Sequence, residues 1–419
     1  MKIKILLFLA GFILAQQIHS QQFALGADVS WLTEMEKYNR KFFTSDGQQK
    51  ECMSLLKENV GMNAIRLRVW VNPTAGWNGL QDVLVKAKRA KSLGMKLMID
   101  FHYSDTWADP GKQTKPAAWA SLDFNQLKQA VYNHTFQVMD SLKFYGIFPE
   151  WVQVGNETGN GMLWETGKAS VSMSNYTQLN NAGYDAVKAV SPNSKVIVHL
   201  HNGYDNGLFR WIFDGLKNNG GKYDVIGMSL YPNWYTTPND WVNANKACLN
   251  NMNDMVSRYG KEVMIVECGM SWDKAADCKN FLTDLINKTK SVTGGKGTGV
   301  FYWEPQCYNW NNYTLGAFEQ VNINGVTGYR PTIALDAFKI ASDLKDVTNN
   351  EFVFQWDSIS GKLSFTIFVE ELKLYDMQGK LIVQKQNIQE YQTTDLSGGV
   401  YLLEIKNSVN GTQICKIII

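Results

Sequence analysis

Short apolar runs of the kind that form buried strands are spread over the first three quarters of the chain. The eight candidates are residues 23–31, 64–71, 96–103, 151–157, 195–203, 224–232, 262–269 and 298–305. Most are continuously apolar through the middle, which is typical of parallel strands covered on both faces. Segments of helical period lie between them, at 47–60, 80–94, 122–146, 176–190 and 273–292. This alternation predicts an α/β fold, a (β/α)8 TIM barrel over residues 21–344.

The N-terminus has the pattern of a signal peptide, residues 1–20. Lys2 and Lys4 precede an apolar stretch at 5–14, and Ser20 is a small residue before the expected cut. The apolar stretch is too short to span a bilayer, and no other segment is apolar enough to do so. We therefore expect an exported protein that is secreted or displayed at the cell surface, without a transmembrane segment.

A different texture begins near residue 345. The polar connector "DLKDVTNNEF" is followed by strand patterns with turn signals at 362–368, 371–385, 398–405 and 412–419. They predict a small all-β C-terminal domain over 345–419, sandwich-like in form. It has few acids near aromatic residues, so we expect no catalytic role for it.

Composition excludes some partners and favours others. With 41 basic and 39 acidic residues the net charge is +2, which implies no nucleic-acid or anionic-membrane partner. Fourteen Trp is a high count, and we expect several to line a groove for sugar rings. The six Cys form no zinc-type cluster. A disulfide from Cys268 to Cys278 or Cys307 and free buried thiols are equal alternatives.

Polar and aromatic residues stand at nearly every strand end. They are Asp28, Ser30, Arg66, Arg68, His102, Tyr103, Asn156, Glu157, His199, His201, Tyr231, Glu267, Trp303 and Glu304. Active sites of such barrels lie at the C-terminal ends of the strands. Each residue alone would be read as a satisfied rim residue, but together they indicate one reactive site.

Glu157 and Glu267 end the fourth and seventh strands and are the candidate catalytic pair. Retaining hydrolysis of a glycosidic bond needs one carboxyl as proton donor and another as nucleophile, about 5–5.5 Å apart. Glu157 follows an apolar strand, where desolvation would raise its pKa and keep the proton. Arg66 or Arg68, which alternation sends to the same side of their strand, would keep Glu267 ionised.

Other strand-end residues suit the substrate. Asn156 can hold a sugar hydroxyl, Tyr231 can donate a hydrogen bond to Glu267, and Trp303 can form the floor under the reacting sugar. Asp28 and Asp105 are expected to bind hydroxyls, and His201 is a further candidate for substrate binding. Metal hydrolysis is the main chemical alternative, because His102, His199 and His201 stand on strand ends. The histidine pair on the first strand of amidohydrolase-like barrels is absent here, so we expect no metal.

These residues stand in motifs that resemble glycoside hydrolase family 53. The motifs are "GADVSW", "AIRLRVWVNP", "DFHYSDTWADPGKQTKPAAW", "WVQVGNETGNGMLW", "GMSLYPNWY" and "GVFYWEP", within residues 23–343. The resemblance implies a clan A endo-β-1,4-galactanase that retains configuration, acts on galactan and needs no cofactor. It implies that Glu157 is the acid/base and Glu267 the nucleophile. Carried over, the supporting residues are Arg68, His102, Asn156, Tyr231 and Trp303, with Asp105 and Trp107 in the family's third-strand loop.

Departures from the family pattern limit what is carried over. Some members hold calcium after the late strands, but the loop "CGMSWDKAADC" is short and has no Asp-rich run. We therefore expect no calcium.

The tail has a resemblance of its own. "LYDMQGKLIV", "DLSGGVYLLEI" and "CKIII" resemble the C-terminal sorting domain of the type IX secretion system of Bacteroidota, which implies that secretion machinery is a partner. A small carbohydrate-binding module is the alternative, disfavoured because no Trp follows Trp356.

Two alternatives to a galactanase remain open. One is another clan A endo-glycanase, a mannanase or a cellulase. The other is a non-catalytic surface glycan-binding protein on a degenerate barrel, which the presence of both carboxylates disfavours. We expect the protein to act as a monomer.

Overall fold

The computed structural model describes residues 22–343, 354–357, 362–376, 378–393, 396, 399–407 and 411–418. The chain divides into two compact units, one spanning Phe23–Lys345 and the other containing Asp346–Ile419. The predicted signal peptide, residues 1–20, lies outside the described residues and stays a prediction. None of the helices in the described ranges combines the length and the apolar character needed to cross a bilayer.

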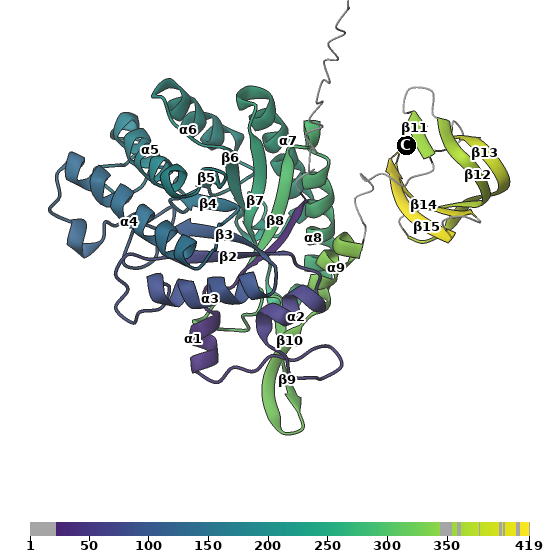
Figure 1. The fold of residues 1–419 in the computed structure, drawn as a ribbon, viewed down its shortest axis with the longest axis horizontal. Helices are drawn as coiled ribbons and strands as arrows, with labels where there is room; N and C mark the ends of the chain where they lie inside the picture. Colours follow the sequence, from purple (N-terminus) through teal and green to yellow (C-terminus); the bar gives the residue numbers. More distant parts are fainter. Residues whose placement is uncertain are drawn as a thin grey trace, which may run out of the picture. The chain divides into compact units, whose positions relative to one another are not determined.

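Eight parallel strands close into a barrel, which confirms the predicted fold (Figure 1). They are β1 (Ala24–Asp28), β2 (Ala64–Val69), β3 (Lys96–Phe101), β4 (Trp151–Val154), β5 (Lys195–Leu200), β6 (Val225–Leu230), β7 (Glu262–Cys268) and β8 (Gly297–Trp303). Each predicted strand is present. All eight end earlier than predicted, because several of the polar residues that follow the apolar runs lie in the loops beyond the strands.

Helices surround the barrel (Figure 1). They are α1 (Leu32–Lys37), α2 (Cys52–Glu58), α3 (Leu80–Ser92), α4 (Phe124–Phe144), α5 (Met173–Val190), α6 (Asn206–Asn218), α7 (Trp241–Tyr259), α8 (Ala275–Lys290) and α9 (Asp336–Asp343). The sequence pattern did not predict α1, α6, α7 or α9, although α6 and α7 each have an aspartate at the N-cap. The Asp205 side chain accepts from the backbone N–H of Leu208, and that of Asp240 from Asn243.

The inside of the barrel changes character along its axis. An apolar layer is formed by Ala24, Ala64, Met98, Trp151, Ile197, Val225, Met264, Val266 and Phe301. Further toward the C-terminal ends, the next inward positions carry Arg66, Asp100, Gln153 and His199, each 0% exposed. Because side chains alternate along a strand, both layers come from the same faces of the strands. The apolar layer fills the barrel toward the N-terminal ends of the strands, and the polar layer underlies the residues at their C-terminal ends.

Two antiparallel strands follow the barrel, β9 (Phe318–Ile323) and β10 (Val326–Pro331). The hairpin was not predicted, although its turn is a strong signal. Asn324 and Gly325 connect the strands with φ values of 51° and 81°. Asn-Gly is the preferred pair for a two-residue turn that needs positive φ at both positions.

The C-terminal unit is all-β, as predicted. Its strands are β11 (Phe354–Asp357), β12 (Lys362–Tyr375), β13 (Leu381–Gln392), β14 (Val400–Asn407) and β15 (Gly411–Ile418). Strand β12 pairs antiparallel with β11, β13 and β14, and β14 pairs with β15. All five strands are joined in one hydrogen-bonded sheet. The sandwich-like arrangement stays a prediction.

Cysteines in the barrel are reduced. Cys52, Cys248, Cys268, Cys278 and Cys307 are free and buried. The proposed disulfide from Cys268 to Cys278 or Cys307 is therefore wrong. Burial raises the pKa of the Cys278 thiol to about 12, so the thiolate, the reactive form, is suppressed.

Candidate active site

Arg66 is the hub of the polar layer. Its Nε donates to Gln153 Oε1 at 2.6 Å, and one terminal nitrogen donates to Asp28 Oδ2 at 2.7 Å. The other terminal nitrogen lies 2.8 Å from Glu267 Oε1 and 3.0 Å from Asp100 Oδ2. A guanidinium always carries its charge, so this buried cation balances the acids around it.

Two consecutive polar residues reach the cavity from the end of β4 because the backbone turns there. Gly155 has a φ of 87° and Glu157 a φ of 47°. A methyl group at Gly155 would lie 2.5 Å from Thr158 Cγ2, so both the conformation and the space require glycine. Because the backbone is left-handed at both Gly155 and Glu157, the consecutive side chains of Asn156 and Glu157 both face the cavity. Regular alternation along a strand would turn one of them away.

Glu267 reaches the same cavity through an irregularity in β7. On that strand Met264 and Val266 belong to the inner apolar layer, whereas Cys268 packs in the outer core. The pairing of β6 with β7 shifts by one residue between Met228 and Ser229. Strict alternation would turn Glu267 outward, and this β-bulge turns it inward.

Asn156, Glu157 and Glu267 line a cavity of about 150 Å³ at the C-terminal ends of the strands. The rest of its wall is formed by His102, Trp107, Ala108, Asp109, Tyr231, Trp234, Trp303 and Tyr313. The Asn156 Oδ1 accepts from Arg66 at 3.0 Å, and its Nδ2 donates to the Ala108 carbonyl at 2.8 Å. The amide orientation is therefore fixed.

The two carboxylates have different partners. Glu157 Oε1 accepts a hydrogen bond from the Ser229 hydroxyl at 2.6 Å. Glu267 pairs with Arg66 and accepts from the Tyr231 hydroxyl at 3.2 Å. An oxygen of Glu157 and an oxygen of Glu267 lie within 4.8 Å of one another. This spacing suits a pair that works on two sides of one bond.

Burial raises the pKa of Glu157, and the nearby Glu267 carboxylate raises it further. Burial also raises the pKa of Glu267, but Arg66 opposes that rise. The proton shared by this coupled pair is therefore held by Glu157, and the negative charge rests on Glu267 beside the guanidinium.

His102 and Asp100 form a second buried pair next to the cavity. The His102 Nε2 lies 3.0 Å from Asp100 Oδ2, and its Nδ1 accepts from the Ala108 backbone N–H. Burial works to raise the pKa of Asp100, but Arg66 and His102 outweigh it and bring the pKa to about 2. Asp100 is thus a permanent anion that balances Arg66.

Among the described residues, Glu157, His199 and Glu267 are close enough to hold a metal ion. Both nitrogens of His199 are already engaged, Nδ1 by Gln153 at 2.8 Å and Nε2 by Ser229 at 2.8 Å. A metal would have to displace one of these contacts. The donor set does not fit a resident metal.

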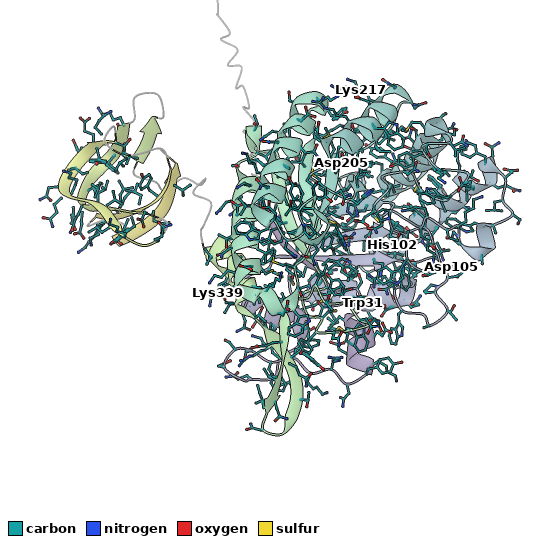
Figure 2. All side chains as sticks on the ribbon, turned by 180° about the vertical axis from the view of Figure 1, so that it is seen from behind. Trp31, His102, Asp105, Asp205, Lys217 and Lys339 are labelled. Atoms are coloured by element: carbon teal, nitrogen blue, oxygen red, sulfur yellow. The ribbon has the colours of Figure 1, made fainter. Side chains whose placement is uncertain are left out.

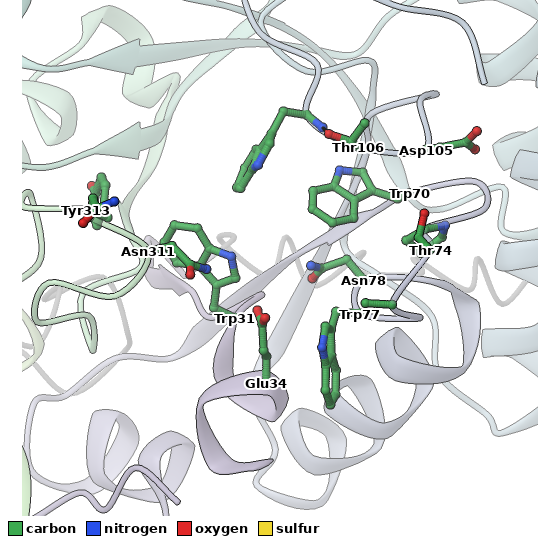
Figure 3. Close-up of a pocket in the computed structure, with 14 residues that line it drawn as sticks. Trp31, Glu34, Trp70, Thr74, Trp77, Asn78, Asp105, Thr106, Asn311 and Tyr313 are labelled. Carbon is green, nitrogen blue, oxygen red and sulfur yellow. Dashed lines mark hydrogen bonds between the residues drawn. The ribbon is translucent and has the colours of Figure 1, made fainter. Parts of the chain in front are cut away.

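A larger cavity, of about 660 Å³, lies beside the first and shares Trp107 and Tyr313 with it. Figure 3 shows Trp31, Trp70 and Trp77 around it. Its polar lining includes Glu34, Asn78, Asp105 and Asn311. Broad aromatic faces with polar groups between them suit sugar rings.

Comparison with known proteins decides the family. The profile of Glycosyl hydrolase family 53 matches residues 24–382, most of the chain. The chain belongs to glycosyl hydrolase family 53. The resemblance seen in the sequence is confirmed, and with it the enzyme class.

The family 53 barrel has named relatives and solved neighbours. The probable arabinogalactan endo-β-1,4-galactanase A of Aspergillus terreus is 37% identical over 324 residues, 71% of this chain and 89% of that protein. A structure described as one of two fungal β-1,4-galactanases matches with a TM-score of 0.68 and 30% identity, over 75% of this chain and 98% of that chain. The GH53 catalytic domain of Ignisphaera aggregans matches with a TM-score of 0.67 and 30% identity, over 76% and 96%.

The tail is confirmed separately. The profile of the Secretion system C-terminal sorting domain matches residues 349–419. The family 53 enzyme therefore carries an export address.

Asp28 and Arg68, both predicted for the family 53 site, line neither of the two cavities. Asp28 is fully buried and binds Arg66, so its expected contact with sugar hydroxyls is wrong. Arg68 is 1% exposed and pairs with Glu304 at 3.7 Å, so its expected place beside the reacting sugar is wrong too. Its guanidinium lies 4.2 Å from the Trp107 ring and supports that side chain from behind.

The predicted contacts of Asp105 and His201 with substrate stay predictions. Asp105 lines the larger cavity, where its carboxylate accepts from the backbone N–H groups of Asn72 and Ala117. His201 packs against Gly159, where a methyl group would lie 2.3 Å from its Cε1. Figure 2 labels Trp31, His102 and Asp105 near the ends of β1 and β3.

Sequence reasoning missed several residues of the family 53 site. Ser229 stands two positions before Tyr231 on one strand face, and Gln153 is the one polar residue within β4. Both were visible signals. Trp234 and Tyr313, which line the cavity, lie in loops whose course the sequence does not give.

Proposed function

We propose that this protein is an exported, retaining endo-β-1,4-galactanase that cleaves internal bonds of galactan and type I arabinogalactan. The observation that carries the proposal is the pair Glu157 and Glu267, with oxygens within 4.8 Å in one cavity. Separations of about 5–5.5 Å favour retention, whereas inverting enzymes need about 6.5–9.5 Å for a water. The Aspergillus terreus relative, a probable arabinogalactan endo-β-1,4-galactanase, supports the choice of polymer.

In the first step Glu267 attacks the anomeric carbon while Glu157 gives its proton to the glycosidic oxygen. The C–O bond breaks and a glycosyl ester forms on Glu267. In the second step Glu157, now a carboxylate, takes a proton from water, and the water oxygen displaces Glu267. Arg66 and Tyr231 hold Glu267 for attack, and burial keeps Glu157 protonated until the bond breaks.

The cavities support action within a polymer. The tryptophan-lined cavity continues from the catalytic one through Trp107 and Tyr313. It can hold sugar units beyond the reacting one. Trp234, 60% exposed and 4.7 Å from the Tyr231 ring, offers a further face.

The deciding experiment follows the products formed from linear β-1,4-galactan over time. Intermediate-length oligosaccharides early in the reaction are expected for internal cleavage. Mannan and cellulose are assayed in parallel, and activity confined to either would overturn the choice of polymer. Unchanged galactan turnover in Glu157→Ala and Glu267→Ala would overturn the two-carboxylate assignment.

Azide separates the two roles. With an activated galactoside, azide should restore turnover of Glu157→Ala and give a product of retained configuration. It should restore Glu267→Ala with an adduct of inverted configuration. The opposite pattern would exchange acid/base and nucleophile.

The destination of the protein follows from its two ends. The sorting domain matched at 349–419 supports export through the type IX system. Fractionation of culture separates the medium from the cell surface, and a chain truncated after residue 345 should reach neither of them.

A further inference from the structure

A row of hydrogen bonds connects Arg66 to Glu157 behind the catalytic cavity, through Gln153, His199 and Ser229. We propose that Ser229, held by His199, is a positioning residue that places the acid proton of Glu157 on Oε2, the oxygen that Ser229 does not contact. The inference rests on the proposed role of Glu157 as acid/base and adds how its proton is directed.

The direction of the row is set at Arg66, which has donors and no acceptor. Its Nε lies 2.6 Å from Gln153 Oε1, so this end of the amide must be the oxygen. The amide nitrogen of Gln153 then donates its two hydrogens, to Asp100 Oδ1 at 3.1 Å and to His199 Nδ1 at 2.8 Å. A flipped amide would set two donors against each other at Arg66.

His199 continues the row, because one ring nitrogen accepts a hydrogen bond and the other donates one. Its Nδ1 accepts from Gln153, and the backbone N–H of Glu157 points at the same atom from 3.4 Å. Asn156 Oδ1, 3.1 Å away, could accept from a proton on Nδ1, but the Gln153 amide hydrogen already points at Nδ1 and leaves no room for one. Burial lowers the pKa of His199 well below its ordinary value, so the ring is neutral and its single proton is on Nε2.

Ser229 completes the row. Its Oγ lies 2.8 Å from His199 Nε2 and accepts that proton, so its own hydrogen is left for Glu157 Oε1 at 2.6 Å. A proton on Oε1 would place two hydrogens in one short contact. The carboxylic proton is therefore on Oε2, ready for the glycosidic oxygen.

The row keeps its direction through both steps. When Oε2 gives its proton to the leaving oxygen, Glu157 becomes a carboxylate and Ser229 still donates to Oε1. When water attacks, its proton goes to Oε2. Ser229 keeps its own proton in both steps, and its hydrogen bond stabilises the carboxylate form of Glu157.

Several charged or titratable groups face Glu157 besides this hydroxyl. They are Glu267 on β7, Arg66 on β2, His199 on β5, Tyr231 beyond β6 and Asp109 in the loop after β3. All of them remain when Ser229 is replaced. The carboxylate then loses a donor while burial and Glu267 continue to disfavour it, so Glu157 becomes a weaker acid.

The kinetic test compares Ser229→Ala on two substrates. On galactan, whose leaving group needs a proton, we expect kcat/KM to fall about tenfold, as for loss of one charge-assisted hydrogen bond. The alkaline limb of its pH profile should move to higher pH. On 4-nitrophenyl β-1,4-galactobioside, whose leaving group needs no proton, kcat/KM should fall less than about threefold, which corresponds to the weakest net contribution of a hydrogen bond.

Equal losses on both substrates with an unmoved alkaline limb would overturn the inference, because they would mark a merely structural role. Ser194→Ala is the matched control. Ser194 is a buried serine before β5 whose hydroxyl donates to the Pro149 carbonyl, far from the cavity lining. It should keep both activities and the pH limb. If Ser229→Ala does not fold, Ser229→Cys replaces it, since its size is similar and its S–H is a weak donor.

A second test needs no substrate. Long-range ¹H–¹⁵N spectra of ¹⁵N-histidine-labelled enzyme report the tautomer of each ring, and the His199 signals are those that move in Ser229→Cys. We expect a proton on Nε2 and none on Nδ1. A proton on Nδ1 would overturn the row. If the enzyme cleaves another glycan, the proposed function fails, and this tautomer still decides the inference.

Discussion

Replacing Arg66 by lysine tests the hub of the polar layer while keeping its positive charge. The guanidinium serves five acceptors, in Asp28, Asp100, Gln153, Asn156 and Glu267, at 2.6–3.0 Å. A lysine ammonium has three donors and cannot span them all. At least two of the five contacts are lost in the variant, and at least one buried acceptor is left unpaired, because only Asp100 Oδ2 keeps another donor, His102 Nε2.

The magnitude follows from these contacts. Each buried acceptor left without a partner costs about 1–3 kcal/mol, so Arg66→Lys, which leaves one or two of them unpaired, should lower the free energy of unfolding by about 1–6 kcal/mol. Loss of the contact with Glu267 removes a charge-assisted bond worth about 1.5–3 kcal/mol, so kcat should fall about 10- to 100-fold. Urea unfolding and steady-state kinetics on galactan measure the two effects separately.

Arg68→Lys is the matched control. Arg68 stands two residues away on β2 and is equally buried, but it contacts Trp107 and Glu304 instead of the catalytic pair. Its variant should raise KM through the displaced tryptophan and leave kcat within about threefold of native, less than the loss of one bond to a charged group. A kcat loss in Arg68→Lys as large as that in Arg66→Lys, or an unchanged kcat in Arg66→Lys, would refute the assignment of Arg66 to the nucleophile.

Three further predictions follow from the same structure. The pH profile of kcat/KM should be bell-shaped: activity is lost as pH falls through the pKa of Glu267, which must be ionised, and as pH rises through that of Glu157, which must be protonated. Burial raises the pKa of both, so both limbs on galactan should lie above the titration of free glutamic acid, and the alkaline limb should be much weaker on 4-nitrophenyl β-1,4-galactobioside, whose leaving group needs no proton; an equally strong limb on both substrates would assign it to another group. Trp77→Ala should raise KM up to about tenfold on long galactan, as for loss of about 0.5–1.5 kcal/mol of aromatic ring contact, and leave the short substrate unaffected; equal changes on both would contradict a role for the larger cavity. Gly155→Ala should lower thermal stability more than Gly76→Ala, because both have φ near 80° but a methyl group meets Thr158 at 2.5 Å in the first and nothing within 4 Å in the second; equal melting temperatures would show that crowding is unimportant.

The sequence by itself determined the barrel and the two acids. The apolar runs of the eight strands are long enough to recognise, and parallel strands alternate with helices in a regular order. Because the C-terminal ends of such strands meet at one rim, the sequence also predicted that Glu157, Glu267 and Tyr231 lie at one site. Motifs shared with family 53 then gave the enzyme class, which the profile match confirmed.

Only the tertiary structure decided which side chains face the cavity. The β-bulge that turns Glu267 inward, and the left-handed backbone at Gly155 and Glu157, break the alternation on which sequence reasoning depends. The choice of Arg66 over Arg68 depends on depth along one strand face, since both point inward and differ by one step toward the rim. The direction of the protons between Arg66 and Glu157 depends on contacts among four strands, β2, β4, β5 and β6, because each partner orients the next only when all are in place.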